Sequence, residues 1–108
     1  MANIPEILYK KILVLDGAMG TMVQTYKLNE NDFRGDRFTS HSQDLQGNND
    51  ILCLTQPDIV EEIHQAYFNA GADIIETNTF NANAVSQADY GMVDHVYDIN
   101  LTAAKIAK

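Results

Sequence analysis

The residues best suited to chemistry in this sequence follow a short apolar run near its start. Residues 12–15 are all apolar, and Asp16, Gly17 and Ala18 come directly after them. In α/β proteins a buried strand delivers such residues to the carboxyl edge of the sheet, where ligands bind. The Asp16 carboxylate could hold an ammonium group, and the Gly17 and Ala18 N–H groups a carboxylate or phosphate. The alternative is that Asp16 caps the helix expected after it.

A second polar cluster follows another apolar run, within residues 72–81. Its tip, residues 76–80, contains threonine, asparagine and threonine in succession and ends in Phe80. This tip is more polar than packing needs, although local turn hydrogen bonds by Asn and Thr are an alternative explanation. Two strands that both end in polar residues favour one shared site.

Two further features are weaker candidates. Residues 47–50, Gly-Asn-Asn-Asp, could reach a polar ligand with their amides, but their composition favours a simple turn. A phosphate-binding turn at residues 17–21 is a third possibility, ranked last because the turn has no basic residue to help hold an anion.

No metal site is predicted within the segment. The three histidines, His41, His64 and His95, show no metal-ligand spacing with a cysteine or carboxylate. Cys53, the single cysteine, lies in an apolar run, so we expect a small buried side chain rather than a reactive thiol. A single cysteine excludes an internal disulfide and suits a reducing cytosol.

The elements that must position these residues are predicted from periodicity and turn signals. Helices are expected at residues 4–10, 19–24, 55–70, 83–88 and 93–108, with a long polar loop at residues 27–50. For the helix at 55–70, Thr55 and Asp58 resemble a capping box, Pro57 suits the first turn, and Gly71 is expected as the C-terminal cap. Its apolar face is expected to hold Ile59, Ile63, Ala66, Tyr67 and Ala70. The strands around this helix give β-α-β order and therefore a parallel pair.

Length and charge limit the class of protein. The 108 residues suffice for one domain at most, and 15 acidic against 7 basic residues give a net charge of -8. This charge argues against nucleic acid or an anionic membrane as partner, and no run is long enough to span a membrane. The start lacks the pattern of a signal peptide, so a cytoplasmic location is expected. Because two parallel strands cannot cover their flanking helices, we expect residues 1–108 to open a larger α/β domain.

Together these residues resemble one family, the homocysteine-binding domain of cobalamin-dependent methionine synthases. The matching motifs are LDGAMGTM at residues 15–22, LQGNND at 45–50, LTQP at 54–57 and AGADIIETNTF at 70–80, and the similarity continues through residues 88–90 and Asn100 to residues 104–105. Several long motifs in the same order cover nearly the whole chain.

The resemblance implies the opening βα units of a (β/α)8 barrel that binds homocysteine at the carboxyl ends of its strands. In that family a zinc ion held by three cysteines binds the substrate thiolate, which attacks the methyl group of methylcobalamin to give methionine. Asp16, Gly17 and Ala18 would grip the amino-acid end of homocysteine. The rest of the pocket in this chain would be Thr77, Thr79, Phe80 and Asn49, beneath the long polar loop.

The resemblance also limits what this segment is expected to do. The zinc cysteines, and the folate-binding and cobalamin-binding modules, would lie downstream, and Cys53 would not be a zinc ligand. The segment would then contain neither catalytic nor metal-binding residues. Two alternatives remain: a homocysteine methyltransferase that uses S-methylmethionine or betaine, and an inactive fragment or binding piece.

Overall fold

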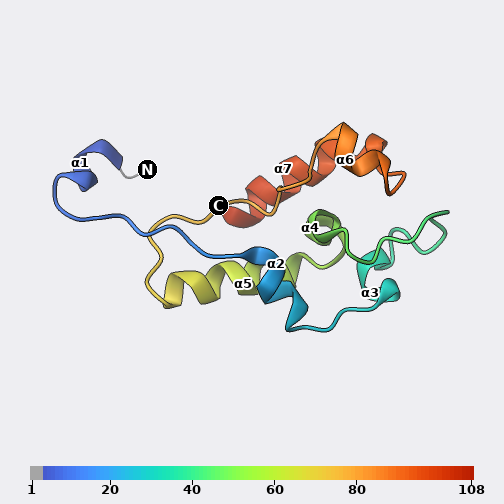
Figure 1. Cartoon of the computed structure of the whole chain (residues 1–108), viewed down its shortest axis with the longest axis horizontal. Helices are drawn as coiled ribbons and strands as arrows, with labels where there is room; N and C mark the ends of the chain where they lie inside the picture. Colours follow the sequence, from blue (N-terminus) through green and yellow to red (C-terminus); the bar gives the residue numbers. More distant parts are fainter. Residues whose placement is uncertain (1–3) are drawn as a thin grey trace.

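The computed structural model describes residues 4–108 and is dominated by helices (Figure 1). The described part is elongated, with extents of 51 × 26 × 18 Å. Its helices are α1 (Ile4–Leu8), α2 (Met19–Gln24), α3 (Glu30–Arg34), α4 (Leu52–Thr55), α5 (Pro57–Asn69), α6 (Ala84–Ala88) and α7 (Val96–Ala107), with 3₁₀ turns η1 (Asn49–Ile51) and η2 (Val93–His95). None of these helices has both the length and the apolar character needed to cross a membrane.

The core lies where α4, α5 and α7 meet, and each of these helices contacts the other two. Leu52 and Cys53 of α4 are fully buried, as are Ile63 of α5 and Ile99 of α7. Loop residues add to this core, among them the fully buried Leu45 and Met92. The amino-terminal segment lies apart from the core, and Figure 1 shows α1 at one end of the molecule.

The two predicted strands are reduced to one parallel bridge, between Leu15 and Ile74, within the described residues. The Asp16 N–H donates to the Ile74 carbonyl (2.9 Å), and the Ile74 N–H donates to the Val14 carbonyl (3.2 Å). The parallel direction and the pairing of the two segments are therefore confirmed, whereas their expected length is wrong.

Side-chain carboxylates explain why the bridge does not extend. In a parallel ladder the next acceptor for the Glu76 N–H would be the backbone carbonyl of Asp16. The Asp16 carboxylate accepts that bond instead, at 3.1 Å. On the other side of the bridge the Asp73 carboxylate accepts from the Val14 N–H (3.0 Å) and pairs with the Lys11 ammonium (2.6 Å). At both ends of the ladder a carboxylate of the facing segment thus takes the N–H group that the next backbone hydrogen bond would use.

The start of α5 also differs from the prediction. Thr55 is the last residue of α4, and its hydroxyl donates to the Ile51 carbonyl (3.3 Å) rather than capping α5. Helix α5 begins at Pro57 after Gln56, whose backbone is not helical (φ −136°, ψ 57°). Proline disfavours helical geometry in the residue before it, so Gln56 separates the two helices. The predicted end is confirmed, because Gly71 adopts a positive φ of 109° after the last turn.

The buried face of α5 is partly different from the expected one. Ile63 is buried as predicted, but Ala66 and Ala70 are exposed. Val60 and His64 are buried in their place. The core formed with α4 and α7 therefore covers the first half of the helix more fully than the second.

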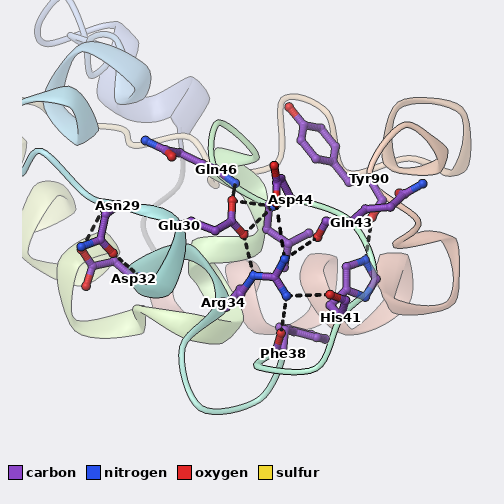
Figure 2. Close-up of polar contacts among 11 residues, drawn as sticks. Asn29, Glu30, Asp32, Arg34, Phe38, His41, Gln43, Asp44, Gln46 and Tyr90 are labelled. Carbon is purple, nitrogen blue, oxygen red and sulfur yellow. Dashed lines mark hydrogen bonds and ion pairs between the residues drawn. The ribbon is translucent and has the colours of Figure 1, made fainter.

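The segment predicted as a polar loop contains structure of its own. Helix α3 starts with a reciprocal capping box: the Asn29 side chain accepts from the Asp32 N–H (2.9 Å), and the Asp32 carboxylate accepts from the Asn29 N–H (3.0 Å). Figure 2 shows how the Arg34 side chain then holds the following turn. The Arg34 guanidinium donates to the carbonyls of Phe38, His41 and Gln43 and to the Glu30 carboxylate.

Candidate functional site

The two polar tips predicted from sequence meet around one cavity. Its volume is about 340 Å³. Its lining comprises Asp16, Gly17, Ala18, Met19 and Gly20 from the first tip and Glu76, Thr77, Asn78, Thr79 and Phe80 from the second. The Leu15–Ile74 bridge brings them together, because it places the residues after each segment on the same side. Six of the seven predicted site residues line this cavity.

Asp16 joins the two tips instead of capping a helix. Its half-buried carboxylate accepts from the Glu76 N–H. Helix α2 begins after Ala18, and no side chain of the described residues caps its first turn. The alternative role as a helix cap is therefore wrong. A carboxylate can accept about four hydrogen bonds, so Asp16 keeps acceptor capacity for a ligand in the cavity.

Helix α5 fixes the turn after Asp16 through Tyr67. The Tyr67 hydroxyl donates to the Ala18 carbonyl at 2.9 Å. A Cβ atom on Gly17 would lie 2.9 Å from the same hydroxyl oxygen and 3.0 Å from the ring. A side chain at position 17 would therefore have to displace the Tyr67 ring from this contact.

The second tip is held together by its own polar contacts. The Thr77 and Thr79 hydroxyls lie 2.7 Å apart and share a hydrogen bond. Asn78 is buried; its side chain donates to the Asn49 carbonyl (2.8 Å), and its own carbonyl accepts from the Cys53 thiol (3.5 Å). The Phe80 side chain is 93% exposed and stands at the rim of the cavity. Part of this polarity thus serves local structure, as the alternative explanation anticipated.

Asn49 lines a different, adjoining cavity of about 350 Å³. The two cavities share four lining residues, namely Met19, Gly20, Asn78 and Phe80. Asn48, which lines this cavity, exchanges two side-chain hydrogen bonds with the buried Gln87 (2.8 and 3.1 Å). Asp50, also in the lining, accepts from the Asn81 N–H (2.8 Å). Burial raises the pKa of Asp50, against that hydrogen bond. The Gly-Asn-Asn-Asp segment is therefore a structural turn that also forms a cavity wall.

The sequence interpretation overlooked His64. Its side chain is 3% exposed, and neither ring nitrogen has a hydrogen-bond partner among the described residues. Burial lowers the pKa of His64, while the charge of Asp16 acts in the opposite direction. The signal in the sequence was its position three residues before Tyr67, which places both on one face of a helix.

The described residues offer no ligand set for zinc. No three His, Cys, Asp or Glu side chains within residues 4–108 converge in a way that could hold a metal ion. Cys53 is fully buried, and burial raises the pKa of its thiol to about 11, so it remains protonated at neutral pH. The described residues therefore do not fit a zinc ion, whose cysteine ligands the resemblance places downstream of this segment.

One comparison with known proteins bears on this site. The sequence model of a family described as Homocysteine S-methyltransferase matches residues 13–108. The matched range contains both polar tips, both cavities and the buried face of α5.

Proposed function

We propose that this chain, which belongs to the homocysteine S-methyltransferase family, supplies the part of the substrate pocket that holds the amino-acid end of homocysteine. The observation that carries the proposal is the single cavity formed by both polar tips, with the Asp16 carboxylate at its wall. An ammonium group would donate to the free acceptor positions of Asp16 in a charge-assisted hydrogen bond. The substrate carboxylate would then lie near the backbone N–H groups of Gly17 and Ala18.

The family reaction moves a methyl group to the sulfur of homocysteine and yields methionine. We assign this chain a binding role in that reaction and place the catalytic and metal-binding residues outside it. Zinc, bound elsewhere in a complete enzyme, would keep the substrate sulfur nucleophilic at neutral pH. The residues described above would orient the opposite end of the same molecule and restrict its motion.

For the methyl donor we favour cobalamin, bound with folate by downstream modules of a cytoplasmic enzyme built on a (β/α)8 barrel. The long polar segment that leads into the Gly-Asn-Asn-Asp sequence supports this choice. S-methylmethionine or betaine is the alternative donor. Longer sequences that contain this chain would distinguish these donors, because only cobalamin requires cobalamin-binding and folate-binding modules after the barrel.

Binding of L-homocysteine to the chain and to Asp16→Asn tests the proposal. The amide preserves the shape of the side chain but removes the charge, so the affinity should fall about tenfold or more. Asp94→Asn is the matched control, because Asp94 is exposed and lines neither cavity. The analogue 4-mercaptobutanoate lacks the ammonium group and should bind equally to the chain and to Asp16→Asn. Equal affinity of both proteins for L-homocysteine would refute the assigned role of Asp16.

A further inference from the structure

The cavity beside the proposed homocysteine site has no part in the proposed function. It measures about 350 Å³ and is lined by the Gly-Asn-Asn-Asp segment, the second polar tip, the start of α2 and residues in and after α6. Three polar residues of this lining are almost fully buried, namely Asn48, Asp50 and Asn78. Buried polar groups in folded proteins nearly always have partners, so an acceptor that they leave open indicates what the cavity can bind.

Asn78 leaves one acceptor open. Its Nδ2 donates to the Asn49 carbonyl at 2.8 Å, and this contact fixes the orientation of the amide because a carbonyl pairs only with the amide nitrogen. Oδ1 accepts no hydrogen bond from the described residues, although Asn78 is 5% exposed. Among the described residues only the ring nitrogens of His64 are both unpartnered and fully enclosed, so Oδ1 of Asn78 reaches open space. Asn78 lines both cavities, which places this acceptor where they meet.

Asp50 adds a buried carboxylate to the same wall. The residue is 3% exposed, and its Oδ2 accepts from the Asn81 N–H at 2.8 Å. None of the ion pairs among the described residues involves Asp50. Burial raises the pKa of its carboxyl, because the charged form loses hydration. Buried charges in proteins are usually paired, so a cation in the cavity would supply the partner that the chain does not.

The rest of the lining favours a cation over an anion. Asp89 is a second acidic residue, and the lining contains no lysine, arginine or histidine. Phe80 and Tyr90 contribute aromatic rings, whose faces attract cations. A primary ammonium group carries three N–H donors and can therefore bond to several of these oxygens at once. An anion would meet two carboxylates and no positive charge.

Hydrogen bonds within the wall hold these groups in place before any ligand binds. Gln87 is fully buried; it exchanges two hydrogen bonds with the Asn48 side chain and also donates to the Asn81 carbonyl at 3.0 Å. The Asn81 N–H in turn holds the Asp50 carboxylate. Three segments distant in sequence are thus tied together around the cavity. A ligand that binds there has little side-chain motion to restrict, which favours affinity.

We propose that this cavity is a second ligand subsite, which takes the primary ammonium group of a small amine while homocysteine occupies the neighbouring cavity. Asp50 supplies the charge, and Oδ1 of Asn78 supplies a neutral acceptor. The ammonium group of homocysteine remains at Asp16, on the wall that only the neighbouring cavity has. The inference goes beyond the proposed function, because binding of an amine here does not require homocysteine.

Titration of n-butylammonium into the isotope-labelled chain, with and without saturating L-homocysteine, tests the subsite. The backbone amides of Asp50, Asn81 and Tyr90 should shift in both cases, with affinities that agree within about threefold. The matched probe n-butyltrimethylammonium has the same chain and charge but no N–H donor, so it should bind about tenfold more weakly. The anion butyrate should cause no shifts at these residues. Equal affinity for the two cations, or displacement of n-butylammonium by homocysteine, would overturn the inference.

Substitutions separate this subsite from the homocysteine site. Asp50→Asn should weaken n-butylammonium binding about tenfold or more and change homocysteine affinity less than about twofold. Asp94→Asn, an exposed substitution outside both linings, is the control and should bind both ligands as the unaltered chain does. Unchanged n-butylammonium affinity in Asp50→Asn would refute the assigned role of Asp50.

Two further outcomes are distinguishable. If Asp50→Asn does not fold, Asp89→Asn takes its place; Asp89 is exposed in the same lining, and its loss should weaken n-butylammonium binding about threefold. Unchanged affinity in that variant would then refute the subsite. Binding of n-butylammonium without any binding of homocysteine would contradict the proposed function and leave the amine subsite supported.

Discussion

Asp16 shows how one carboxylate can serve both structure and ligand binding. It closes the parallel bridge by accepting the Glu76 N–H, and it lies in the cavity wall with spare acceptor capacity. The sequence predicted that Asp16 follows a strand-like segment and meets the second tip. The structure places both tips around one cavity, but the carboxylate's bond to a backbone N–H could not be foreseen, because it depends on the register of Leu15 against Ile74.

The two glycines of this turn should respond differently to the same substitution. Gly17→Ala should lower the free energy of unfolding by about 1–3 kcal/mol, because the new methyl group meets the Tyr67 hydroxyl at 2.9 Å. Gly20→Ala is the matched control, since its nearest neighbour would be the Asn49 side chain at 3.6 Å. Alanine also favours helix at that position in α2, so its stability should be equal or up to about 1 kcal/mol higher. Chemical denaturation measures both values, and equal losses would contradict the close packing.

Cys53 should be inert while the chain is folded. Its side chain is fully buried and its thiol pKa is raised to about 11, so at neutral pH almost no thiolate is available for reaction. The rate of modification by a disulfide reagent should therefore follow the unfolded fraction as urea is added. Fast labelling in the absence of urea would show that the thiol is accessible and reactive.

At the scale of elements, local signals predicted helices more reliably than strands. The bounds of α2 agree with the prediction, and Gly71 ends α5 as expected, since turn and capping chemistry acts over a few residues. Helix α3 was missed although Asn29 and Asp32 have capping-box spacing. The two strands were overestimated because an apolar run does not reveal that aspartates will close the ladder after one bridge.

The pair of Glu30 and Arg34 should control the stability of the segment around α3. The Glu30 carboxylate accepts from the Leu45 and Gln46 N–H groups and from Arg34. Burial raises the pKa of Glu30, but these hydrogen bonds outweigh it and hold the pKa below 4.5. The stabilisation is therefore present at neutral pH and is lost as the pH falls through the pKa of the folded state.

Glu30→Gln should accordingly lower the free energy of unfolding by about 1–3 kcal/mol at pH 7, with a smaller difference at acidic pH. Glu61→Gln, an exposed substitution on α5, is the control and should change stability little at either pH. Denaturation at pH 7 and at acidic pH measures the difference. A loss of equal size at both values would show that the Glu30 charge is not responsible.

At the scale of the whole molecule, the helices form one core while the bridged segments remain largely uncovered. Ile12 is 87% exposed, and Val14 and Leu15 are also exposed, although the sequence marks all three as strand interior. A parallel sheet is normally buried on both faces. The family match and these exposed apolar residues together support the proposal that further barrel strands cover this edge.

The central claim is that both tips hold one ligand, and chemical-shift mapping with L-homocysteine tests it most directly. On titration into the isotope-labelled chain, the largest shifts should fall on the backbone amides of residues 16–20 and 76–80, with those of α7 unchanged. The same titration of Asp16→Asn should produce much smaller shifts at both tips. Shifts confined to one tip, or centred away from both, would contradict a shared homocysteine pocket.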